Sequence, residues 1–207
     1  MPAKAHNEPR GWTTAEAAFI LGAPLDAFKK TVDRSPVKPA VVRRGGLRVR
    51  YFAFPDLVYL HALDELGRWF TRESRQDFYW AVKRAALDKI DAVAFGPLTV
   101  NVRPHIIFVQ AKTKELDRLS AEIDTRGDEA LIKGTTIEAH RIAALLDGGM
   151  SVEEVLADYP TLKERQVLAA KAFAEANPKP GRPYPGRTAK AALRNADLGR
   201  LGEFLDD

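Results

Sequence analysis

Apolar residues near the N-terminus recur at helical spacing and predict two short helices joined by a turn. Thr13 suits the N-cap of the first helix, because Glu16 lies three residues further on in the capping-box position. Gly22 suits the end of this helix, and Pro24 suits the first turn of the next. The second helix has an apolar face and, away from it, three cations: Lys29, Lys30 and Arg34. A helix pair of this kind is typical of a helix-turn-helix.

Alternation of apolar and polar residues after the helix pair predicts a β-hairpin. Two strands, over 41–44 and 47–51, flank Gly45–Gly46, a dipeptide that readily adopts the positive φ of a tight turn. In the second strand the apolar residues share one face, and the hairpin carries four arginines: Arg43, Arg44, Arg48 and Arg50. A further helix begins near Phe54 and runs to Gly67. A basic hairpin directly after a helix pair is typical of the wing of a winged helix-turn-helix.

Charge strengthens this interpretation. Residues 1–60 contain ten lysines and arginines against five acidic residues, so their net charge of +5 exceeds the +4 of the whole chain. A basic domain on a nearly neutral remainder is what the phosphate backbone of DNA attracts. We therefore expect this domain to bind DNA. The alternative is a helical domain whose hairpin only seals a core.

The segment from Gly11 to Leu63 resembles the winged helix-turn-helix of the MerR class of regulators. The resemblance lies in the run Trp12–Ala18, in the arginine-rich hairpin, and in the closing helix with its Phe-x-x-x-Asp-Leu-Val-Tyr-Leu pattern. By the geometry of that class, residues 24–34 would enter the major groove and residues 43–50 would lie on a backbone or in the minor groove. Recognition of palindromic DNA would imply a homodimer.

The middle of the chain is predicted to connect two domains. A helix rich in aromatic residues is expected over 74–90. The alternating run 98–102 and the apolar run 105–109 predict a hairpin that turns at Arg103–Pro104 and offers an edge to another chain. A short amphipathic helix, ending before Arg126, completes the region.

Three short helices are predicted in the C-terminal half. The first follows the run Gly134–Ile137 and ends at Gly148–Gly149. Ser151 caps the second and Thr161 caps the third, each with a glutamate three residues further on. The result is a small trihelical domain of the helix-turn-helix kind. Its charge is nearly balanced, so its fold does not imply contact with DNA.

This trihelical segment resembles a small bacterial domain family of predicted antitoxin components. The resemblance covers residues 131–176 and lies in three motifs: Gly134–Ile137, Gly149–Val155 and Asp158–Leu162. The first motif departs from the family pattern, because Thr136 stands where the family has an arginine. Together with the MerR-like domain, the arrangement resembles VapB-type antitoxins, which implies a PIN-fold ribonuclease toxin as partner.

The C-terminal tail begins with a basic, proline-rich segment. Residues 177–187 contain four prolines and two arginines but no acid, so they favour an extended path over a helix or a central strand. PIN-type ribonuclease sites are acidic, so such an arm could dock there. We expect three residues to contact the partner: Arg182, Tyr184 and Arg187. A solvated linker to a weak terminal helix is the alternative.

Other chemistry finds no support in the sequence. With no cysteine, four scattered histidines and no nucleophile or phosphate-loop motif, we expect no catalytic residue, no metal site and no cofactor. No run of about 18 apolar residues and no signal peptide are present, so a cytoplasmic protein without membrane contact is expected.

The predicted fold class is mainly α with small β-hairpins. We expect four regions, over residues 1–68, 69–130, 131–176 and 177–207: the winged domain, the connecting region, the trihelical domain and the tail. The predicted function is that of a non-enzymatic antitoxin, which neutralises a PIN-fold ribonuclease and binds operator DNA to repress its own operon. The alternative is a homodimeric MerR-like regulator without a toxin partner.

Overall fold

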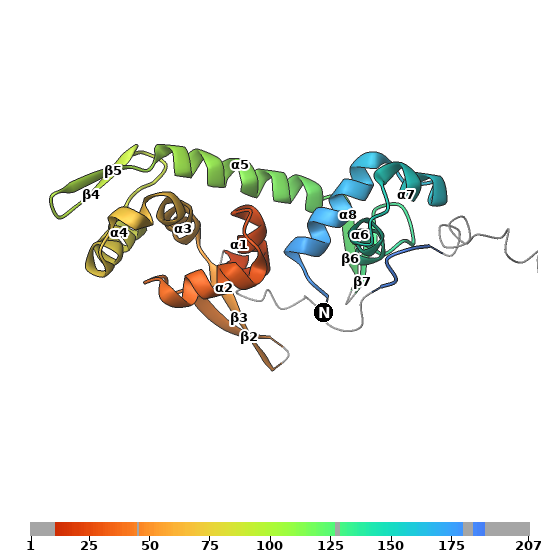
Figure 1. The fold of residues 1–207 in the computed structure, drawn as a ribbon, viewed down its shortest axis with the longest axis horizontal. Helices are drawn as coiled ribbons and strands as arrows, with labels where there is room; N and C mark the ends of the chain where they lie inside the picture. Colours follow the sequence, from red (N-terminus) through yellow and green to blue (C-terminus); the bar gives the residue numbers. More distant parts are fainter. Residues whose placement is uncertain (1–10, 45, 127–128, 180–183, 189–207) are drawn as a thin grey trace, which may run out of the picture. The chain divides into compact units, whose positions relative to one another are not determined.

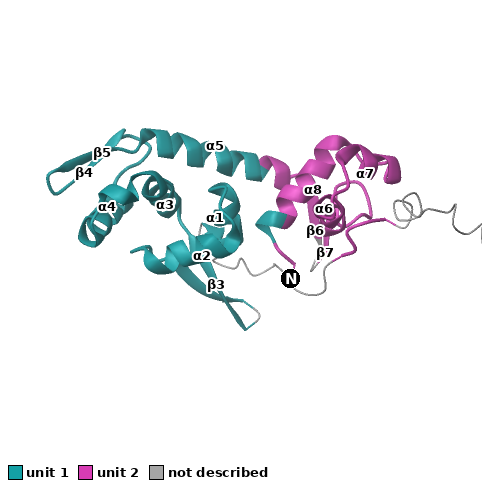
Figure 2. Cartoon of the chain, viewed as in Figure 1, with its two compact units in different colours: residues 1–117, 175–177 teal, residues 118–174, 178–207 magenta. Residues whose placement is uncertain are grey.

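Helices predominate in the computed structural model, and the sheets are small and antiparallel (Figure 1). The structure describes residues 11–44, 46–126, 129–179 and 184–188. The chain divides into two units (Figure 2): Met1–Asp117 with Glu175–Asn177, and Arg118–Ala174 with Pro178–Asp207. In the parts of the chain that the structure describes, no helix is both long and apolar enough to cross a membrane.

The first unit begins with a short strand and two helices: β1 (Trp12–Thr13), α1 (Thr14–Ile20) and α2 (Leu25–Arg34). The predicted capping box of α1 is confirmed, since the Glu16 amide donates to Thr13 Oγ1 and the Thr13 amide donates to Glu16 Oε2. Gly22, with φ of +64°, ends the first helix in a conformation that favours glycine. Phe28 and Val32 bury the inner face of α2.

The predicted basic hairpin is also confirmed. Strands β2 (Ala40–Arg44) and β3 (Leu47–Phe52) pair antiparallel, and β1 joins the other edge of β3, so the sheet order is β1-β3-β2. Burial increases along β3 from exposed Leu47 to fully buried Phe52. The base of the hairpin therefore belongs to the core, and its far end stands in solvent.

An aromatic cluster holds the next three elements together: α3 (Phe54–Leu66), the 3₁₀ turn η1 (Gly67–Trp69) and α4 (Arg72–Arg84). Tyr59 of α3 packs against Phe78 and Tyr79 of α4, with ring centroids 5.5 and 5.2 Å apart. Phe70 and Phe95 extend the cluster around Phe78. These aromatic side chains belong to the core of the first unit or pack against it. Helix α4 ends at Arg84, earlier than the predicted 90.

The connecting region differs from the prediction. The hairpin is formed by β4 (Ala92–Phe95) and β5 (Leu98–Asn101), which turn at Gly96 with φ of +53°. The predicted strand over 105–109 is wrong, because these residues belong to α5 (Arg103–Ser120). Pro104 lies in the first helical turn, where a missing N–H costs nothing. The edge strand that we expected to offer to another chain is therefore absent from this segment.

The second unit places a hairpin before three helices: β6 (Ile123–Arg126), β7 (Glu129–Ile132), α6 (Ala139–Asp147), α7 (Val152–Asp158) and α8 (Glu164–Ala176). The Ser151 capping box is confirmed. The predicted cap at Thr161 is wrong, since α8 begins three residues later and the Lys163 amide donates to Gln166 Oε1 instead. The hairpin was not predicted. Its first strand begins at Ile123, which the sequence placed in a short helix ending before Arg126.

Candidate nucleic-acid interface

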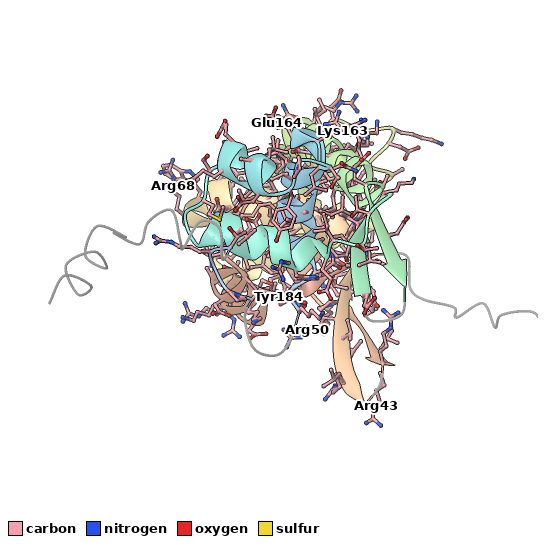
Figure 3. All side chains as sticks on the ribbon, turned by 90° about the vertical axis from the view of Figure 1, so that its right-hand side faces the viewer. Arg43, Arg50, Arg68, Lys163, Glu164 and Tyr184 are labelled. Atoms are coloured by element: carbon pink, nitrogen blue, oxygen red, sulfur yellow. The ribbon has the colours of Figure 1, made fainter. Side chains whose placement is uncertain are left out.

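A concentration of cations lies on one face of the β2–β3 hairpin. The strand register places Arg43 directly opposite Arg48 and Val41 opposite Arg50, so these four side chains share a face. No acidic residue occurs between Ala40 and Phe52. In Figure 3, Arg43 lies near the far end of the hairpin and Arg50 nearer its base. The face therefore offers a line of positive charge that extends away from the core.

The opposite face of the hairpin is buried only near its base. Val49 is half-buried and Tyr51 is buried, but Leu47 is 71% exposed and stands opposite the exposed Arg44. The predicted alternation is thus correct in register. It does not bury Leu47, because this end of the hairpin extends beyond the core of the unit.

An ion pair joins the hairpin to α2. Arg50 Nη1 lies 2.7 Å from Asp33 Oδ1, and both side chains are partly exposed. On the same helix Lys29 pairs with Asp26 at 3.0 Å, while Lys30 and Arg34 are exposed. The structure therefore brings the C-terminal half of α2 and the basic strand together. Of the expected DNA-contacting cations, Lys29 and Arg50 have acidic neighbours.

A histidine pair was not foreseen from the sequence. Nδ1 of His61 on α3 lies 2.9 Å from Nδ1 of His105 on α5, and the His61 ring stacks on Phe108. Burial lowers the pKa of both imidazoles below the ordinary value, and for His61 the neighbouring His105 lowers it further. The contact is a hydrogen bond only when one Nδ1 carries a proton and donates it to the other, so the two imidazoles cannot both be protonated. Among the described residues, no group of three or more His, Asp or Glu side chains could hold a metal ion.

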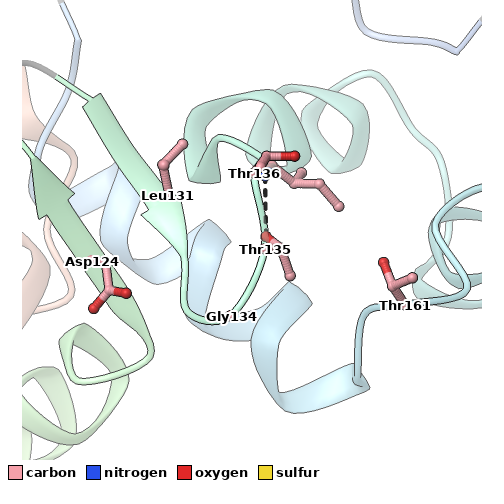
Figure 4. Close-up of a pocket in the computed structure, with 7 residues that line it drawn as sticks. Asp124, Leu131, Gly134, Thr135, Thr136 and Thr161 are labelled. Carbon is pink, nitrogen blue, oxygen red and sulfur yellow. Dashed lines mark hydrogen bonds between the residues drawn. The ribbon is translucent and has the colours of Figure 1, made fainter.

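In the second unit the motif Gly134–Ile137 builds a turn between β7 and α6. Gly134 has φ of +77°, and Thr135 Oγ1 donates to the Ile132 carbonyl while accepting from the Ile137 amide. This turn lines a cavity of about 610 Å³ (Figure 4), with Asp124, Leu131 and Thr161 on its other sides. Thr136 also lines it, at the position where the resembling family has an arginine.

The other two motifs of this unit also have structural roles. Gly149 has φ of +88° between α6 and α7, and Ser151 begins α7. In the third motif the Tyr159 hydroxyl accepts from Arg141 Nε at 2.9 Å, and Leu162 is buried in the core. The three motifs therefore form the turns that connect the successive elements.

The described part of the tail lies against its own unit. Lys179 and the Tyr184 hydroxyl both donate to Glu138, at the start of α6. The Thr188 hydroxyl donates to Asp158, at the end of α7. Tyr184 is thus half-buried by this chain, while Arg182 lies outside the described residues. Arg187, the third residue expected to contact a partner, is exposed and lies in the described segment 184–188.

The fold defines a mostly helical chain whose second unit is a hairpin followed by three helices. Comparison with known proteins adds that residues 122–174 match the model of a family described as "Protein of unknown function (DUF433)". An "Uncharacterized protein y4eO" of Sinorhizobium fredii (strain NBRC 101917 / NGR234) is 34% identical over 92 residues, which cover 41% of this chain. The match spans 40% of that relative's length. No solved structure matches the chain.

Proposed function

We propose that the protein is a DNA-binding regulator whose first unit contacts DNA through α2 and the β2–β3 hairpin. The observation that carries the proposal is the juxtaposition of Arg43 and Arg48, with Arg50, on one hairpin face. Like charges directly opposite one another destabilise a hairpin, so an anionic partner that neutralises them has a physical advantage. The order of helix pair, hairpin and closing helix supports the interpretation as a winged helix-turn-helix.

A binding assay with two duplexes tests this function. One duplex is the DNA directly upstream of the protein's own gene, and the other has the same length and base composition in shuffled order. We expect tighter binding to the upstream duplex at physiological salt. Replacement of Lys30 by Ala should weaken binding, and it should also relax the preference if its side chain reaches base edges. Absence of binding to either duplex at low salt would refute the proposal.

We further propose that the regulator is an antitoxin for a PIN-fold ribonuclease. The match of residues 122–174 to the DUF433 family and the three motifs in that segment support this part of the proposal. Co-expression with the product of the neighbouring gene, followed by co-purification, tests it. Truncation after Ala176 should leave operator binding intact and should impair rescue of growth when the toxin is expressed. Equal rescue by the truncated and full-length proteins would assign the toxin contact to the trihelical segment.

One observation favours the second candidate, a homodimeric regulator without a toxin. Tyr184, whose side chain we expected to contact a toxin, donates its hydroxyl hydrogen bond to Glu138 of its own unit. A tail engaged in this way has a structural role that needs no partner. Growth of cells that carry only the neighbouring gene separates the two candidates, because an antitoxin is needed only where that product is toxic.

A further inference from the structure

Both ends of the basic hairpin are connected to one buried pair of side chains. The hairpin begins two residues after Lys38 and ends one residue before Ala53. The Lys38 amide donates to the Tyr79 hydroxyl at 3.4 Å, and the Ala53 amide donates to Asp56 Oδ2 at 2.8 Å. The Tyr79 hydroxyl in turn donates to Asp56 Oδ1 at 3.1 Å. A continuous chain of hydrogen bonds thus joins the entry and the exit of the hairpin.

The side chains of Asp56 and Tyr79 are too deeply buried to bind a partner at the surface. Asp56 is 1% exposed and Tyr79 is 1% exposed. Lys83 Nζ lies 2.6 Å from Asp56 Oδ1 and compensates the buried carboxylate. Burial raises the pKa of Tyr79 to about 12, so its hydroxyl keeps the proton that it donates to Asp56.

Capping of α3 explains only part of this arrangement. The cap needs one carboxylate oxygen, Oδ2, which accepts from Ala53 in the first turn of the helix. The second oxygen, Oδ1, accepts from the Tyr79 hydroxyl, and that hydroxyl accepts from the Lys38 amide in the segment before β2, 41 residues away from Tyr79 in sequence. We infer that Asp56 and Tyr79 are positioning residues that fix the direction in which the basic hairpin leaves the core. The consequence for DNA binding rests on the function proposed above.

Tyr59 provides a matched control for Tyr79. Its ring packs against that of Tyr79 with centroids 5.2 Å apart, and it is equally buried. Its hydroxyl, unlike that of Tyr79, has no hydrogen-bond partner among the described residues. Tyr59→Phe and Tyr79→Phe therefore make the same chemical change in the same core, but only the second removes a link to the hairpin.

The mobility of the hairpin tip tests the inference without DNA. The chain contains no cysteine, so Leu47→Cys gives a single site for a nitroxide label at an exposed position. We expect Tyr79→Phe to shift the label spectrum towards faster, less ordered motion and to speed amide exchange at Lys38. Tyr59→Phe should change neither. An unchanged spectrum and unchanged exchange in Tyr79→Phe, with the fold intact by circular dichroism, would overturn the inference.

DNA affinity of the unlabelled full-length variants is the second measurement. Tyr79→Phe should bind the upstream duplex up to about tenfold more weakly, since it removes a hydrogen bond that orders the hairpin. Tyr59→Phe should bind like wild type. A mobile tip with unchanged affinity would support the positioning role but overturn its consequence for DNA binding. Failure of the wild-type protein to bind DNA would refute the proposed function, while tip mobility would still decide whether the pair holds the hairpin.

Discussion

Arg43 and Arg48 stand directly opposite one another in the β2–β3 ladder, near the end of the hairpin that extends into solvent. Two exposed guanidinium groups in this relationship repel, and the cost for such a pair is about 0.2–1 kcal/mol. The protein thus keeps an unfavourable cross-strand pairing on the basic face of the hairpin. An anion bound between the two groups would relieve it.

Removal of one member of this pair should stabilise the protein while weakening DNA binding. For Arg48→Thr we expect the free energy of unfolding to increase by up to about 1 kcal/mol at low salt. The gain should disappear in high salt, which screens exposed charges. Urea titrations at two salt concentrations measure the gain in the free energy of unfolding and its loss in high salt. Lys30→Ala, which removes an exposed cation from α2, should show no comparable gain; an equal gain there would point to net charge instead of the cross-strand contact.

Neutralising Asp33 should strengthen DNA binding. Asp33 holds Arg50 in an ion pair at 2.7 Å, so Asp33→Asn releases this arginine for phosphate and removes a negative charge beside the basic strand. Exposed pairs contribute little, so we expect about a two- to fivefold gain in affinity. Asp147→Asn, which removes the acid paired with Lys171 in the second unit, makes the same change of charge elsewhere. An equal gain in both variants would show that Arg50 has no special position.

The histidine pair predicts a loss of stability in mild acid. The pKa values of His61 and His105 are lowered in the folded state, so the unfolded chain binds more protons. Their contribution to stability is therefore fully present above the unfolded pKa of about 6.5 and is lost as the pH falls through the folded values. Thermal unfolding between about pH 7.5 and 5 measures this loss. His61→Phe should flatten the dependence of the unfolding temperature on pH. If the variant showed the same dependence as the wild type, the histidine pair would not be the source of the loss.

Two hydroxyl residues that look equivalent in the sequence should behave differently. Ser151 caps α7 in a complete capping box, so Ser151→Ala should cost about 1 kcal/mol of stability. Thr161 precedes α8 by three residues and does not cap it, so Thr161→Ala should change stability by less than about 0.5 kcal/mol. Urea titration of both variants checks the difference. Equal costs would place the start of α8 at Thr161, as the sequence suggested.

The local signals in the sequence predicted the N-terminal elements well. The Thr13 box, Gly22 and the Gly45–Gly46 dipeptide each act over a few residues, and the corresponding elements form as expected. The run from His105 to Val109 was misleading, because a short apolar run has no periodicity that separates a strand from a buried helix. Only over a longer stretch do Val102, Ile106 and Val109 show one helical face.

The sequence predicted which residues make up the candidate site, but not the contacts that those residues make with other elements. Four arginines around a hairpin turn are visible in the sequence, and the strand register follows from the turn. The contacts between Asp33 and Arg50, and between His61 and His105, join residues 17 and 44 positions apart. Such contacts depend on how the elements pack, which alternation and capping signals do not encode.

The salt dependence of DNA affinity tests the central claim most directly. The logarithm of the binding constant should fall linearly with the logarithm of salt concentration, because each neutralised phosphate releases counterions. We predict that Arg43→Ala with Arg48→Ala weakens binding and reduces the magnitude of this slope by about two, one for each phosphate that an arginine no longer neutralises. Arg141→Ala with Arg165→Ala, the same change in the second unit, should leave affinity and slope unchanged. If the hairpin variant retained the affinity and the slope of the wild type, the basic hairpin would not be the DNA-binding surface.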